Sequence, residues 1–120
     1  MMGFSFNNNP RIIVPHTFHD AATTTGDGTK LTLNGKNKLI LNISGTSTSR
    51  TITFKIVSNN IVSYTLGSKV TSTGDITLAT NTTGTGEVWE ISDLAGYDEV
   101  YCSLDAVAGG NVTVKGKLVD

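Results

Sequence analysis

The sequence predicts an all-β protein, an antiparallel β-sandwich of about eight strands, and three observations support this class. Apolar residues alternate with polar residues in several short runs, which is typical of sheets with one buried face. Turn-forming residues separate these runs. Thr, Gly, Ser and Asn make up 52 of the 120 residues, and Gln is absent, a composition that favours strands over helices. The sequence leaves a jelly-roll and an immunoglobulin-like strand order open.

We expect residues 1–15 to form an extended N-terminal arm, followed by a single sandwich domain at 16–120. Pro10 and Pro15 are the only prolines and both lie in the arm. Proline fixes φ and removes an amide donor, so it suits an extended leader better than a central strand. The arm also holds apolar side chains without an obvious place in the sandwich, and we predict that they bind a partner: Phe4, Phe6, Ile12, Ile13 and Val14.

The clearest alternation occurs in three predicted strands: Lys38–Ser44, Arg50–Ile56 and Asn111–Leu118. In the first of these, Leu39, Leu41 and Ile43 point to one side, which we assign to the core. The same reasoning predicts six further short strands: Arg11–Val14, Thr29–Leu33, Ile61–Leu66, Asp75–Ala79, Glu87–Ile91 and Glu99–Leu104.

Turn residues lie between these strands. Asn34-Gly35 follows one strand, and Asn59-Asn60 separates two β-branched runs by only two residues. Asn and Gly tolerate the positive φ of a tight hairpin, so Asn59-Asn60 predicts a hairpin turn. Gly109-Gly110 predicts a slightly longer hairpin loop. The segment Ile91–Gly96 is too short for a helix and predicts a crossover turn.

Composition excludes several classes of function. Nine basic and ten acidic side chains give a formal charge of -1, so the chain has no general electrostatic attraction for nucleic acid or anionic lipid. Its apolar runs are too short to span a membrane, and its first residues do not resemble a signal peptide. A single Cys cannot form an internal disulfide. We therefore expect no nucleic-acid or membrane partner.

Two patterns suggest metal ligands without completing a site. His16 and His19, followed by Asp20, have a possible ligand spacing, but residues three apart on a strand face opposite ways, and zinc needs three or four convergent ligands. We interpret this segment as a polar loop. Gly26-Asp27-Gly28 and Gly74-Asp75 resemble fragments of calcium loops but lack the full ligand series. We expect turns there, with a weak ion as the alternative, and no cofactor.

Catalytic patterns are also missing. Cys102 alternates with Val100 and Leu104, so we expect a small buried apolar residue and not a nucleophile. No nucleotide-binding glycine loop or Gly-x-Ser-x-Gly sequence occurs. Carboxylates are present, but a glycosidase needs two of them facing each other across a cleft. They are Asp93, Asp98, Glu99 and Asp105. We therefore expect that the protein is not an enzyme.

The most distinctive segment is Glu87–Val100, a strand, an Asp93-Leu-Ala-Gly-Tyr97 corner and a second strand. The tail Asp105–Val114 closes with a hairpin. With the Thr-rich body, these segments resemble the small β-sandwich structural proteins of tailed bacteriophages, of the head decoration or tail accessory type. They resemble jelly-roll carbohydrate-binding modules more loosely.

The phage resemblance implies a virion structural protein, most specifically a capsid decoration protein that binds the shell by surface burial. Its partners would be the major capsid protein or other virion subunits, and the chain would form a homo-oligomer such as a trimer. It would be located in the virion, assembled in the bacterial cytoplasm. Alternatives are a tail or neck component, or a carbohydrate-binding module. The last requires an exposed aromatic platform drawn from Trp89, Tyr64, Tyr97 and Tyr101; for Trp89 we expect a core position.

Overall fold

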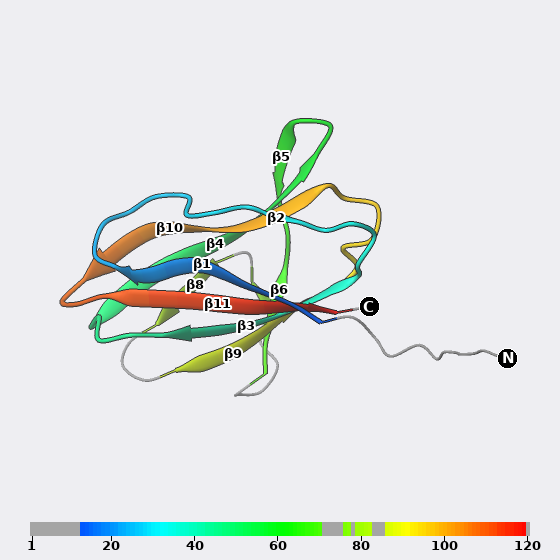
Figure 1. Ribbon diagram of the computed structural model, residues 1–120. Coiled ribbons are helices and arrows are strands. Elements are labelled where there is room, and N and C mark those ends of the chain that lie inside the picture. The colour runs from blue at the N-terminus through cyan, green and yellow to red at the C-terminus, as the bar shows by residue number, and fades with distance from the viewer. Residues whose placement is uncertain (1–12, 71–75, 78, 83–85, 120) are drawn as a thin grey trace, which may run out of the picture.

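The structure is a computed structural model that describes residues 13–70, 76–77, 79–82 and 86–119. Two antiparallel sheets lie against each other (Figure 1), and the described residues contain no helix. The predicted all-β sandwich is therefore confirmed. The described strands number eleven, more than the sequence predicts, because several of them are only two to four residues long.

The first sheet has six strands in the order β1-β11-β3-β9-β6-β7. Their bounds are β1 (Val14–Ala22), β11 (Val112–Val119), β3 (Lys38–Ser44), β9 (Glu87–Ile91), β6 (Gly67–Lys69) and β7 (Ile76–Thr77). The second sheet has the order β2-β10-β4-β5, and β8 also pairs with β4. Its strands are β2 (Leu31–Thr32), β10 (Glu99–Ala108), β4 (Ser49–Ser58), β5 (Ile61–Tyr64) and β8 (Ala79–Thr82).

Strand β1 corrects two expectations. The strand predicted at Arg11–Val14 instead begins at Val14 and runs to Ala22. The His16–His19 segment, predicted as a polar loop, therefore lies in a strand. Backbone pairing with β11 overrides the polar composition, and a bulge between Thr17 and His19 turns two consecutive side chains inward.

The expected arm overlaps this strand at its end. Val14 and Pro15 pair with β11, and Val14 packs against the core. Pro15 is accommodated because β1 is an edge strand of its sheet. Ile13 is 53% exposed. The other predicted partner-binding residues, Phe4, Phe6 and Ile12, lie outside the described residues, as does Gly74-Asp75.

The core fills the space between the two sheets. Leu39, Leu41 and Ile43 are fully buried, as their alternation predicts. The ring of Phe54 on β4 meets that of Trp89 on β9 with centroids 5.4 Å apart, so this contact joins the two sheets. Trp89 is 2% exposed, which confirms its expected core position.

The predicted turns form where Asn and Gly occur in pairs. Asn59 and Asn60 have φ of 50° and 67° and connect β4 to β5, which confirms the predicted hairpin. Asn34 and Gly35 also have positive φ, 50° and 81°. Figure 1 shows that the β4–β5 hairpin stands out from the body of the sandwich.

After β5 the chain crosses from the second sheet to the first within two residues. The Thr65 amide donates to the Phe54 carbonyl over 3.0 Å and anchors the start of this crossing. Gly67 is buried against the Phe54 ring, and a Cβ on it would collide with that ring. Only glycine therefore lets β6 begin so close to the core.

Cys102 lies on β10 and is fully buried in the same core. Burial raises the pKa of its thiol far above the usual value, because desolvation disfavours the thiolate. The expectation of a small buried apolar residue is confirmed.

Gly45 provides a test of the β3–β4 connection. Its φ is +132°, and a Cβ on it would collide with the Asn111 backbone carbonyl, so Gly45→Ala should lower the free energy of unfolding by about 1–3 kcal/mol. The matched control is Gly26→Ala, since a Cβ on Gly26 has nothing within 4 Å. This control should stay within about 0.5 kcal/mol of the unchanged protein. Urea unfolding measures both variants, and equal destabilisation would contradict the prediction.

Burial also predicts that Cys102 is inert. A soluble disulfide reagent should label it at the rate of global or sub-global opening, many orders of magnitude slower than in denaturant, across pH 6–9. Because the thiol pKa is raised, the thiolate fraction within the folded state stays negligible over this whole range. Stopped-flow labelling measures the rate, and rapid labelling of the folded protein would show that the site is open.

Candidate functional site

The two histidines do not form a shared site. His16 Nε2 lies 2.9 Å from Thr29 Oγ1, and its ring packs edge-on against Phe18. His19 is buried and its Nε2 donates to the Cys102 carbonyl over 2.6 Å. Within the described part of the chain, no three His, Cys, Asp or Glu side chains gather to hold a metal.

The candidate carboxylates are dispersed in the same way. Asp98 Oδ2 accepts the Asn59 amide over 2.8 Å and braces the hairpin turn. Asp105 accepts hydrogen bonds from the Ser103 and Thr53 hydroxyls on the second sheet. These contacts give both carboxylates structural roles. Asp93 is placed differently, because it lines a cavity.

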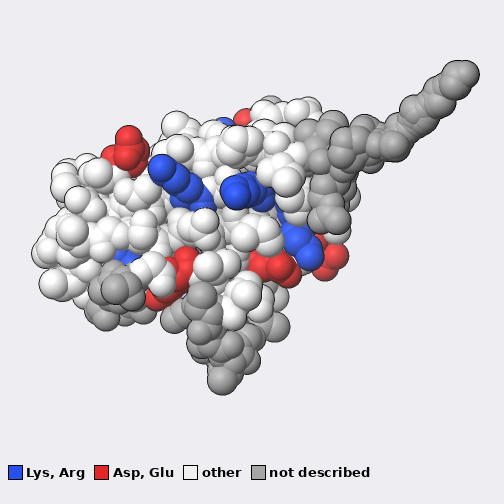
Figure 2. Space-filling view, turned by 60° about the horizontal axis from the view of Figure 1, so that its bottom comes forward, with Lys and Arg blue, Asp and Glu red and all other residues white. Residues whose placement is uncertain are grey.

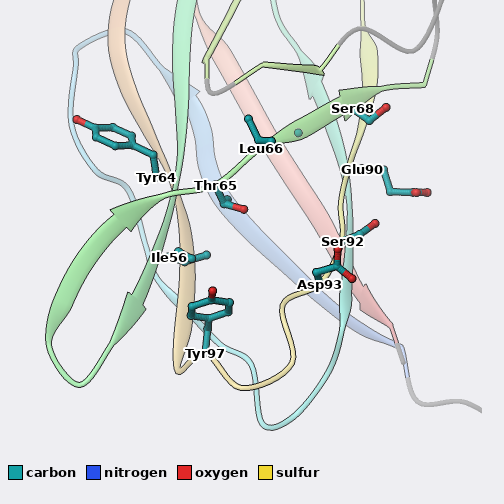
Figure 3. Close-up of a pocket in the computed structure, with 10 residues that line it drawn as sticks. Ile56, Tyr64, Thr65, Leu66, Ser68, Glu90, Ser92, Asp93 and Tyr97 are labelled. Atoms are coloured by element: carbon teal, nitrogen blue, oxygen red, sulfur yellow. The ribbon is translucent and has the colours of Figure 1, made fainter.

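That cavity, of about 460 Å³, lies between the β5–β6 crossing and the β9–β10 connection. Ile56 and Leu66 form an apolar part of its wall, and Tyr97 lies at one side of it (Figure 3). Polar groups come from Thr65, Ser68, Glu90, Ser92 and Asp93.

A second cavity of about 200 Å³ adjoins it, since Ile56 and Tyr97 line both. It follows the β4–β5 hairpin, with Asn59, Ile61 and Ser63 along its wall. We call the two cavities together the hairpin groove. Tyr97 lies where they meet, so the same aromatic side chain lines both cavities.

The corner before Tyr97 is firmly anchored. Leu94 is fully buried, and its amide donates to the Asn37 carbonyl over 2.9 Å. The Tyr97 amide donates to the Leu94 carbonyl over 3.1 Å. Asp93 has a φ of 60°, a left-handed conformation that Asp tolerates. These contacts fix the backbone of the corner from Asp93 to Tyr97.

The four candidate platform aromatics divide into two pairs. Trp89 and Tyr101 are 2% and 4% exposed and cannot form a platform. Tyr64 and Tyr97 are 62% and 39% exposed, and both line the larger cavity. In Figure 3 the Tyr64 ring points away from Tyr97, and Lys55 Nζ lies 5.7 Å from its centre. Tyr97 is therefore the aromatic ring best placed inside the groove.

A group of apolar side chains is exposed on and just after β5. We call it the hairpin patch: Ile61, Val62, Tyr64 and Leu66, which are 48–68% exposed. Sequence reasoning missed this patch, because it assigned the segment only as a strand. The available signal was the adjacent pair Ile61-Val62, since neighbouring strand residues face opposite sides and both cannot enter one core.

Charge does not single out any other surface. Figure 2 shows basic and acidic side chains interspersed on the face that it displays, without a large region of one sign. Among the residues that the structure describes, no helix has the length and hydropathy needed to cross a bilayer.

The chain is similar to known prophage-derived proteins in both sequence and structure. It is 38% identical over 107 residues to the SPbeta prophage-derived uncharacterized protein YomS of Bacillus subtilis (strain 168), covering 86% of this chain and 84% of that protein. The crystal structure of SPBc2 prophage-derived protein YomS matches with a TM-score of 0.84 and 32% identity, covering 97% of this chain and all of that one.

The crystal structure of the PBSX exported protein XepA has the same fold, with a TM-score of 0.86 at 24% identity. The match covers 95% of this chain but 40% of XepA, so XepA is much longer. The model of the XepA family matches residues 13–118, the range in which the sandwich lies. The chain therefore belongs to the XepA family and is a phage-associated protein.

Proposed function

We propose that this chain is a phage virion structural protein, specifically a capsid decoration protein, which attaches by burying apolar surface. The observation that carries the proposal is the hairpin patch, most of which lies on β5 in the projecting β4–β5 hairpin (Figure 1). Burying an aliphatic side chain contributes about 1.5–3 kcal/mol. A patch of this size, repeated on many copies, is sufficient for attachment to a large assembly.

The backbone of β5 adds a second means of attachment. β5 is the last strand of the second sheet, and within the described ranges no strand pairs with its outer edge. Unpaired amide and carbonyl groups on such an edge form hydrogen bonds readily with an added strand. The patch and the edge lie on the same hairpin, so a partner strand would use both.

The proposed function does not involve catalysis. Its single thiol is buried with a raised pKa, and His19 is buried against a backbone carbonyl. The proposed partners are the major capsid protein or other virion subunits, with the chain as a homo-oligomer such as a trimer located in the virion. A tail or neck component is the nearest variant, because the same surface would serve there.

Carbohydrate binding is the second candidate function. It required an exposed aromatic side chain, and Tyr97 meets this requirement inside the hairpin groove. The relative XepA is described as exported, and an exported protein can meet the glycans of a bacterial surface.

The patch predicts the effect of a single charge. Val62→Lys should weaken co-sedimentation with particles of the encoding phage by about tenfold or more, because an unpaired ammonium would be buried at the contact. The matched control is Val70→Lys, since Val70 is exposed to a similar degree, 54% against 48%, but lies outside the patch. Thermal unfolding checks that both variants fold. Equal attachment of both variants would remove the patch from the proposal.

A separate experiment tests the arm. A deletion of residues 1–12 leaves β1 intact, because β1 begins at Val14. The sandwich should therefore keep its unfolding temperature. If the arm binds a sister copy or the shell, the truncated protein should lose oligomerisation or attachment, measured by analytical ultracentrifugation and co-sedimentation. Unchanged assembly would show that the predicted arm contacts are wrong, whereas the hairpin patch would stand.

A further inference from the structure

We propose that the hairpin groove binds an uncharged oligosaccharide, with the Tyr97 ring as its stacking surface. This inference gives the second candidate function a site and a ligand class, and it does not depend on attachment to a capsid. The groove has the size of a small-molecule site, since its larger cavity of about 460 Å³ lies within the usual range.

Tyr97 has the properties of a sugar platform. It is 39% exposed and stands between the two cavities, so a ring placed over it would extend into both. Sugar rings present C–H groups on one face, and the electron-rich face of an aromatic ring attracts such groups. The anchored corner holds the backbone of Tyr97 in position, so binding orders only its side chain and costs less entropy.

A sugar also carries many hydroxyl groups around its ring, and these need hydrogen-bond partners. The polar groups around Tyr97 can supply such partners. Glu90 and Asp93 supply carboxylate oxygens as acceptors, and Ser68 and Ser92 supply hydroxyls that both donate and accept. In Figure 3, Ser92 and Asp93 lie across the groove from Leu66 and Thr65. A ligand between these walls would meet a hydroxyl and a carboxylate on one side, and the Leu66 side chain with the Thr65 hydroxyl on the other.

The same carboxylates decide the charge of the ligand. Glu90 forms a 3.7 Å ion pair with Lys38, but both side chains are about one third exposed, so the pair is weak and screened. No basic residue lines the described walls of either cavity. Acidic sugars would therefore be repelled, and uncharged sugars are favoured.

A saccharide fits the groove better than a peptide strand does. A peptide added to this sheet would pair with the outer edge of β5, and the groove lies along the face of the hairpin. Hydroxyl and carboxylate side chains line the larger cavity beside an apolar wall that exposes somewhat more area. A saccharide can use both, with its hydroxyls on the polar groups and its C–H faces on the apolar wall.

Nuclear magnetic resonance titration of the full ¹⁵N-labelled chain tests the site. The probes are oligomers of N-acetylglucosamine and of galactose, with galacturonic acid oligomers as the acidic counterpart of the same skeleton. We expect a neutral oligomer to shift amides in 56–68 and 90–97, and galacturonate to bind at least tenfold more weakly. Shifts confined to other residues, no shift with either neutral oligomer at millimolar concentration, or equal binding of galacturonate would overturn the proposal.

Two variants sharpen the result. Tyr97→Ala should weaken binding of the neutral oligomer by roughly three- to tenfold, the usual contribution of an aromatic contact. Asp93→Asn keeps a residue that tolerates positive φ and should reduce the difference between galactose and galacturonate oligomers. The matched control is Glu99→Gln, a carboxylate outside the groove, which should bind as the unchanged protein does. Full binding by Tyr97→Ala would overturn the proposal.

The hairpin patch and the groove share Ile61, Tyr64 and Leu66, so the two functional proposals are separated at the residues that they do not share. Val62 does not line the groove, so Val62→Lys should lose particle attachment and keep saccharide binding, whereas Tyr97→Ala should do the reverse. Loss of saccharide binding in a folded Val62→Lys variant would overturn the placement of the saccharide in the groove.

Discussion

The contact between Phe54 and Trp89 is the interaction on which the rest of the structure depends. It joins β4 of the second sheet to β9 of the first, so it sets the spacing of the two layers. The Phe54 ring also packs against Gly67, where the chain passes from one sheet to the other. The groove wall begins at this crossing, and the groove therefore rests on the same aromatic residue as the core.

Alternation predicted the parts of the fold where one face is buried and the other is wet. β3 and β9 have the predicted bounds, and the corner before Tyr97 is a turn as expected. Alternation could not predict β1, because its bulge breaks the period and its pairing with β11 spans the length of the chain. Alternation places Arg50 on the same face as Ile52 and Phe54, but its charge gave no reason to expect burial. In the structure it is fully enclosed, with Nη1 donating to Ser47 over 2.9 Å.

The candidate site was only partly predictable for a related reason. The sequence singled out Tyr64, Tyr97 and Asp93 as residue types, and the structure brings them to one cavity. Their proximity depends on where the chain crosses between sheets and on the direction of the hairpin, which local patterns do not encode. Conversely, the histidines and Asp105 look functional in the sequence, but their contacts are structural. His16 lies against Thr29 in the connection before β2, and His19 on β1 donates to β10 of the other sheet. Asp105 on β10 accepts from Thr53 on the paired strand β4.

The exposure of β5 has a consequence for how such a protein can evolve. All four residues of β5 are exposed, so none contributes to the packed interior. Under the proposed function, mutations there would change the contact with the partner without requiring the interior to repack. The residues that hold the fold together thus differ from those of the proposed contact, so substitutions in one short hairpin could give this scaffold a new partner at little cost in stability.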